Sequence, residues 1–222
     1  MHQGDGSDDE IIQHPGFTLY DGFYLVDFMR PVRMLSSAPI NGGYGLCSRY
    51  VNRTVPRNFS DDPVEDSRLF LRRYGIDFKG TCMTLTACDV ESYSGGTSRS
   101  GDHFIYSWVT AGASNAISMG SNGESGAGTV NIAVATDAPL SDSACFNLIQ
   151  SIVEAKTQLF NDLGIRDLHS GKIAPGTSTD TVSLFVLSGR TEIPYAGRLT
   201  AIGRSTADLV YDLVGQALSR CK

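Results

Sequence analysis

Two glycine-rich segments carry the residues best suited to hold a ligand. The first runs from Val109 to Asn131 (VTAGASNAISMGSNGESGAGTVN) and joins two apolar stretches of strand length. The second runs from Ala174 to Asp180 (APGTSTD) and leads into the apolar stretch VSLFVL. Glycine lets the backbone approach a ligand closely, and serine, threonine and asparagine offer neutral hydrogen-bonding groups. The pattern indicates a binding site, although a flexible surface loop would have the same composition.

A lysine lies on the apolar face of a predicted helix between these two segments. The helix begins after Ser141 and ends before Gly164, and at about 100° per residue one of its faces is apolar. Lys156 falls on that face. An unpaired buried charge costs several kcal/mol, so the ammonium either extends along the helix into solvent or reaches a buried polar site.

The order of strands and helices predicts one α+β domain, with a mixed, mostly antiparallel sheet and two long helices packed on it. The first strands form a hairpin about Asp21-Gly22. A short helix is expected between Asp62, its N-cap, and Gly75, and the last helix spans 202–218. The segment 89–102 is expected to be a loop. Further strands are expected at 33–39, 48–55, 81–88, 103–112, 129–136 and 182–187.

Composition and charge exclude several classes of protein. The chain has 222 residues, 41% of them hydrophobic, and a net charge of −6. Lysine and arginine do not cluster among aromatic residues, so nucleic acid and anionic membranes are poor partners. The apolar runs are too short to span a membrane, and residues 1–13 form an acidic leader that we expect to be disordered. These features are typical of a cytoplasmic protein.

The cysteines and histidines give no metal-binding or disulfide pattern. The five cysteines lie in apolar or terminal contexts without a C-x-x-C pair, and the four histidines are scattered. A zinc site or a disulfide framework is therefore not expected. A phosphate-binding enzyme is also disfavoured, because neither glycine motif for phosphate binding occurs between a strand and a helix.

Several separate segments resemble the adenosylcobinamide amidohydrolases, the CbiZ family, in the order that the family has them. The similarity covers Phe23 to Leu218 and departs from the family at Ser178, where a glycine or alanine is expected, and in the acidic leader. The matching segments are LSSAPINGG with the later Asn52, VTAGASNAISMG, GTVN, PLSDSA, EAKTQLFNDLGI, GTSTDTV and YAGRLTAIG. The resemblance implies an amidohydrolase domain over 14–222.

The resemblance implies hydrolysis of the amide between the corrin side chain and aminopropanol, with cobalt carried by the substrate and no cofactor held by the protein. A corrinoid-binding module without catalysis is the alternative. The partner would be a small-molecule corrinoid, and a homo-oligomer is possible. A large neutral macrocycle suits neutral hydrogen-bonding groups. The expected substrate contacts are Ser36, Ser37, Gly42, Gly43, Asn52, Thr110, Ser114, Asn115, Thr177, Ser178 and Thr179.

Amide hydrolysis without zinc needs a group that activates a nucleophile and a group that stabilises an oxyanion. Asp180 is the best base or orienting acid, because it closes the only segment rich in glycine and threonine that ends in a carboxylate; a cap of local amides is the alternative. Lys156 is expected to face this segment and to pair with Asp180 or a neighbouring polar group. Further candidates are the hydroxyls of Thr129, Thr177 and Thr179, and as oxyanion donors Asn131 and the amides around Gly128 and Gly176.

Overall fold

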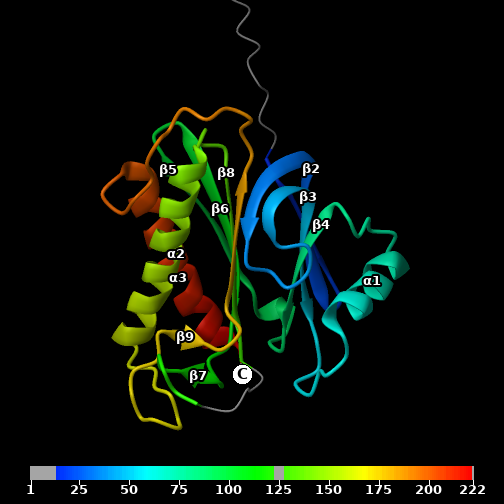
Figure 1. The fold of residues 1–222 in the computed structure, drawn as a ribbon, viewed down its shortest axis with the longest axis vertical. Coiled ribbons are helices and arrows are strands. Elements are labelled where there is room, and N and C mark those ends of the chain that lie inside the picture. Colours follow the sequence, from blue (N-terminus) through cyan, green and yellow to red (C-terminus); the bar gives the residue numbers. More distant parts are fainter. Residues whose placement is uncertain (1–13, 123–127, 222) are drawn as a thin grey trace, which may run out of the picture.

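The computed structural model describes residues 14–122 and 128–221, which form a sheet flanked by helices (Figure 1). The main sheet has the strand order β4-β3-β2-β10-β8-β6-β5, and β1 pairs with β2 beside this path. The helices are α1 (Pro63–Arg73), α2 (Asp142–Asp162), α3 (Ala201–Arg220) and the short 3₁₀ helix η1 (Val90–Ser92). The strands are β1 (Gly16–Tyr20), β2 (Phe23–Ser36), β3 (Gly43–Thr54), β4 (Thr81–Thr86), β5 (Ser94–Ser100), β6 (His103–Ala111), β7 (Ala116–Ile117), β8 (Val130–Thr136), β9 (Gly176–Thr177) and β10 (Thr181–Val186).

The strand directions confirm a mixed, mostly antiparallel sheet. Only β3 with β4 and β8 with β10 pair in parallel within the described chain, and β7 and β9 form a small antiparallel sheet of their own. The two long helices are α2 and α3, as expected, but α1 is a third helix on the opposite side of the molecule (Figure 1). No helix in the described ranges is long and apolar enough to cross a bilayer. The acidic leader, 1–13, lies outside the described residues.

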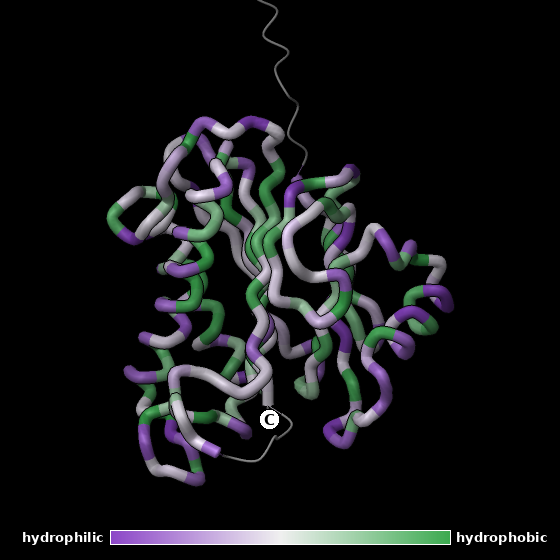
Figure 2. Tube along the Cα trace, in the orientation of Figure 1, coloured by the Kyte–Doolittle hydropathy of each residue, from purple (hydrophilic) through white to green (hydrophobic). Residues whose placement is uncertain are grey.

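Three apolar clusters hold the layers together. The largest lies between α2, α3 and the sheet, and includes Leu148, Ile152 and Val134. A second lies between the two halves of the sheet, where Tyr50 and Cys82 meet residues of β6, β8 and β10. The third packs Leu71 of α1 on the outer face of β3 and β4. Hydrophobic residues accordingly concentrate along the central strands (Figure 2).

Helix ends lie where their capping residues predict. The Asp62 carboxylate accepts hydrogen bonds from the Val64 and Glu65 amides at the start of α1. The Ser141 hydroxyl accepts one from the Ala144 amide at the start of α2. Each contact satisfies backbone donors that lack an intrahelical partner. The cap at Ser141 fixes where α2 begins and therefore which of its residues face the sheet.

Two local expectations are corrected. The segment 89–102 is not a loop, because it forms η1 and then β5, which pairs with β6. Its glycines hide the strand pattern, but Gly96 lies against Leu209 and Leu213 of α3, which cover the strand in place of a side chain. The second half of the hairpin and the 33–39 strand are one strand, β2, interrupted by an irregularity between Asp27 and Val32.

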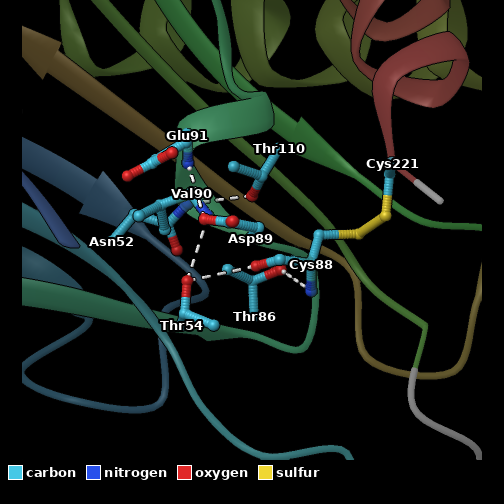
Figure 3. The surroundings of a disulfide bond; sticks show 9 residues. All are labelled: Asn52, Thr54, Thr86, Cys88, Asp89, Val90, Glu91, Thr110 and Cys221. Atoms are coloured by element: carbon cyan, nitrogen blue, oxygen red, sulfur yellow. Dashed lines mark hydrogen bonds between the residues drawn. A yellow bond between two sulfur atoms is a disulfide. The ribbon is translucent and has the colours of Figure 1, made fainter. Parts of the chain in front are cut away.

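The structure also corrects the expectation of no disulfide bonding. Cys88 and Cys221 form a disulfide although they are 133 residues apart, and Cys47, Cys82 and Cys145 are free and buried. The fold places the end of α3 beside the segment that follows β4 (Figure 3). Neither cysteine lies in a short motif, so their spacing carried no signal of the pairing.

A buried carboxylate joins the loop after β7 to the loop after α2, and we expect it to make stability depend on acid pH. The hydroxyls of Ser121 and Ser170 lower the pKa of Asp167, which also accepts from the amide and hydroxyl of Ser118. Its stabilising effect is present above the pKa of an unfolded aspartate, about 4, and is lost as the pH falls below that value.

Denaturant melts of the wild type and Asp167→Asn at several pH values test this. The wild type should lose stability between about pH 4 and pH 2, whereas the variant should be less stable at neutral pH and show a flatter profile. Parallel profiles would contradict the assignment.

Candidate active site

Asp180 is held by four hydrogen bonds at the point where β9 turns into β10. Its Oδ1 accepts from the Val130 amide at 3.0 Å and from the Thr177 hydroxyl at 2.5 Å. Its Oδ2 accepts from the Thr177 amide at 3.1 Å and from Lys156 Nζ at 2.5 Å. A carboxylate has about four acceptor positions, so these four donors occupy all of them. Asp180 therefore caps the 177–180 turn and also pairs with the Lys156 ammonium.

Lys156 reaches this carboxylate from the inner face of α2. The residue is only 8% exposed, and its ammonium pairs with Asp180. The prediction that it faces the GTSTD segment and pairs with Asp180 is confirmed, and the alternative of an ammonium extended into solvent is excluded. Gly176 lies directly against the pair, since a Cβ atom there would collide with Asp180 Oδ2 and Lys156 Nζ. Glycine at this position is therefore what lets the two charges meet.

Two cavities meet at Asp180. One, of about 510 Å³, lies between the sheet and α2 and has a largely apolar wall that includes Tyr44, Phe146 and Val182. The other, of about 560 Å³, is lined on one side by the 55–63 segment, including Arg57, and also includes Thr129. Ser37 and Asp180 line both cavities, whereas Lys156 lines only the one beside α2. Because Asp180 lines both, a substrate in either cavity can reach it.

The threonine hydroxyls around Asp180 point in different directions. Thr177 donates to Asp180, whereas Thr129 donates to the Thr179 carbonyl at 2.9 Å and Thr179 to the Gly128 carbonyl at 3.0 Å. These bonds close the end of the first glycine-rich segment onto the second. Thr129 and Thr179 line the cavity beside the 55–63 segment, so both remain candidates for substrate contact. Among these three, Thr177 has the hydroxyl that contacts the carboxylate.

Asn52, Thr110 and Asn131 do not reach either cavity, contrary to expectation. All three are fully buried. Asn131 Nδ2 donates to Asn52 Oδ1 at 3.0 Å and to the Leu85 carbonyl at 2.8 Å, and Asn52 Nδ2 donates to the Thr110 hydroxyl at 2.8 Å. With both amide hydrogens of Asn131 engaged, it has no donor left for an oxyanion. These residues join the two halves of the sheet behind the site.

The other residues expected to contact the substrate lie in several different places in the structure. Ser36 bonds to Ser183 at 2.6 Å and supports the strand end that carries Ser37. Gly43 lines the cavity beside α2, and Gly42 packs against the Ala38 backbone. Asn115 donates to the Ser178 hydroxyl at 3.1 Å, which joins the two glycine-rich segments, and Ser114 lines a separate cavity of about 90 Å³ beside the disulfide.

Sequence reasoning missed the apolar cavity walls. Tyr44 and Phe146 are 62% and 60% exposed, and they line the cavity that contains Lys156. Phe59 and Arg57, from the segment before α1, line the other cavity. Large apolar side chains exposed on a helix or strand are the signal that could have found them. No group of three or more His, Cys, Asp or Glu side chains that could hold a metal ion occurs within 14–122 and 128–221.

The carboxylate and the ammonium are in contact, a hydroxyl donates to the same carboxylate, and open cavities lie beside them; hydrolysis can use such a proton acceptor and proton donor. A family model for adenosylcobinamide amidohydrolases (CbiZ) matches residues 9–222. An adenosylcobinamide amidohydrolase of Methanosarcina mazei is 32% identical over 184 residues, which cover 78% of this chain and 84% of the relative. One of Halobacterium salinarum is 26% identical over 212 residues, covering 90% and 86%.

The chain therefore belongs to the adenosylcobinamide amidohydrolase family, and it is an amidohydrolase. Among solved structures, an L-aminopeptidase D-Ala-esterase/amidase from Ochrobactrum anthropi covers 91% of this chain and 78% of its own, with a TM-score of 0.48 and 13% identity. A likeness at that level assigns neither a fold nor a mechanism.

Proposed function

We propose that the protein hydrolyses the amide between the corrin propionyl side chain and aminopropanol in adenosylcobinamide, giving adenosylcobyric acid and 1-amino-2-propanol in corrinoid salvage. The observation that carries the proposal is the Lys156–Asp180 pair at the junction of two cavities, in a chain of this family. Its role follows from what amide hydrolysis requires. A nucleophile must lose a proton, and the leaving nitrogen must gain one.

The attack step uses the carboxylate. A water at the substrate carbonyl gives a proton to the Thr177 hydroxyl while Thr177 gives its own proton to Asp180, along the 2.5 Å bond already present. This relay suits a carboxylate whose acceptor positions are occupied by bonded donors. The charge that develops on the carbonyl oxygen is stabilised by the nearby Lys156 ammonium.

The collapse step uses the ammonium. An amide nitrogen leaves as a neutral amine only after protonation, and Lys156 supplies that proton to the aminopropanol nitrogen. The proton taken up by Asp180 then passes to Lys156 across the 2.5 Å contact, which restores both groups for the next turnover. Atoms balance, because water adds across the C–N bond.

The cavity walls suit a large substrate that carries many neutral amide side chains. Apolar side chains such as Phe146 and Phe59 can pack on the macrocycle, and Ser37 and Thr129 offer neutral hydrogen bonds. We propose that the substrate occupies both cavities, because Asp180 lies in the wall of each. Cobalt enters with the substrate, and the protein itself holds no cofactor in this proposal.

Incubation of the full chain with adenosylcobinamide, with and without a chelator, tests the activity. We expect equal amounts of adenosylcobyric acid and 1-amino-2-propanol, followed by chromatography and mass spectrometry, at the same rate in both samples. Loss of activity with the chelator and its return with zinc would contradict the metal-free part. Tight corrinoid binding without product would instead identify the binding module.

A further inference from the structure

Asp180 lines two cavities, and the disulfide joins the C-terminal helix to the wall of the one beside the 55–63 segment (the Asp180 cavity). Cys221 follows α3 directly, and Cys88 follows Thr86 and Ala87, which line that cavity (Figure 3). The backbone at Cys88 is fixed on both sides, since its amide donates to the Thr86 hydroxyl and its carbonyl accepts from Thr54. A displacement of Cys88 would therefore also move Thr86 and Ala87 in the cavity wall.

The sulfur atoms also contact a second part of the same wall. A Cβ atom at Gly112 would lie 2.6 Å from the Cys88 sulfur and 3.1 Å from the Cys221 sulfur, so the disulfide packs on the bare Gly112 backbone. The Gly112 amide donates to the carbonyl of Thr129 at 2.9 Å, and Thr129 lines the Asp180 cavity. Two wall segments that are distant in sequence thus depend on one covalent bond.

Thiol reagents have a route to this bond. Cys221 is half-buried, and a cavity of about 90 Å³ contacts both cysteines. That cavity also shares Arg57 and Ala87 with the Asp180 cavity. The three other cysteines are buried, and burial raises the pKa of Cys82 and Cys145 to about 11, which keeps their thiols protonated and unreactive near neutral pH.

We propose that Cys88 and Cys221 are positioning residues for the corrinoid site, and that the oxidation state of their bond sets substrate affinity. The inference rests on the proposed function. A dithiol reductant transfers two electrons and two protons to the disulfide, which becomes two thiols, while the reductant becomes a cyclic disulfide. Release of Cys88 then loosens the 86–87 wall and the Gly112–Thr129 contact.

The chemical step is expected to be spared. Lys156, Asp180 and Thr177 lie on α2 and the β9–β10 turn, and their mutual hydrogen bonds involve neither sulfur. Reduction should therefore raise KM for adenosylcobinamide about 2- to 30-fold, the usual range for coupling through packed elements, and leave kcat within about twofold.

The test compares oxidised wild type, wild type kept in dithiothreitol, and Cys221→Ser with and without dithiothreitol, with bonding verified by non-reducing peptide mapping. Measurements are made well below each thermal midpoint. We expect the same raised KM in reduced wild type and in Cys221→Ser. The KM of the variant should not change when dithiothreitol is added. A lower thermal midpoint with unchanged KM would overturn the proposal, because a bond that only stabilises the fold gives that result.

Equilibrium dialysis of adenosylcobinamide separates this inference from the proposed reaction. A weaker Kd after reduction, in a protein without detectable hydrolysis, supports the positioning role and overturns the proposed function. Equal Kd values in both states overturn the positioning role alone. Absence of corrinoid binding in either state overturns both.

Discussion

Lys156→Met should fold normally and lose turnover by about a hundredfold or more, the scale expected when a proton donor is removed from the reacting centre. Methionine keeps the length and apolar contacts of the lysine stem on α2. Asp180 keeps three donors in this variant, namely both groups of Thr177 and the Val130 amide, so the carboxylate is not left unsatisfied. Steady-state kinetics with circular dichroism and a thermal melt give both quantities.

Asp180→Asn should lose turnover to a similar extent but be clearly less stable than Lys156→Met. The NH₂ group of the asparagine would face hydrogen-bond donors, because every partner of the Asp180 carboxylate is a donor. Lys156 would also lose the one anionic partner that the described chain gives it. Leaving a buried charge unpaired costs about 3–5 kcal/mol. The order of the two melting midpoints is thus part of the prediction.

Lys79→Met is the matched control, because this lysine is exposed on the surface. It should change neither turnover nor melting temperature. A fully active Lys156→Met protein would show that the ammonium only neutralises Asp180, and a stable, active Asp180→Asn protein would reduce Asp180 to a cap of the turn.

Gly176→Ala should separate the two charges without removing either. The added methyl group would occupy the space where Asp180 Oδ2 and Lys156 Nζ meet, and the long lysine side chain is the part most able to move away. We expect turnover to fall by about a hundredfold, because misplacement of a reacting group by about 1 Å costs that much. The stability loss should be smaller than for Asp180→Asn, because both charges remain in the protein and still attract each other after a small displacement.

Gly45→Ala provides the comparison, because a Cβ atom there would meet nothing within 4 Å. Kinetics and melts of the two variants, measured side by side, isolate the effect of crowding at the pair. Normal turnover in Gly176→Ala would mean that contact between Lys156 and Asp180 is not required for the reaction.

The sequence was most informative where one residue type had to satisfy a strong physical requirement. A lysine on an apolar helix face must find a partner, and the carboxylate that closes the GTSTD segment is the partner it finds. Capping residues likewise located the ends of α1 and α2. In each case local chemistry determined the outcome.

Features that depend on distant packing could not be predicted in the same way. Gly96 of β5 is covered by leucines of α3 and Gly95 by aromatic side chains, so the strand depends on packing that its own residues do not show. Cys88 likewise meets Cys221 only after α3 has packed. Asn131 looked like a ligand because it follows a glycine-rich loop, yet alternation along β8 turns it toward Asn52 between the halves of the sheet. The sequence alone does not show which strand faces which.

The buried Asn52–Asn131 contact also selects the register of the strands. Thr181 lies opposite Asn131 in the parallel pair of β10 and β8, and its hydroxyl donates to Asn131 Oδ1 at 2.8 Å. A slip of β8 by one residue would turn Asn131 toward the apolar layer under the helices, leaving its amide unsatisfied at a cost of about 1–3 kcal/mol. The same alignment puts the Val130 amide within 3.0 Å of Asp180. A polar contact buried between the two halves of the sheet thereby helps to determine the position of the Asp180 carboxylate in the candidate site.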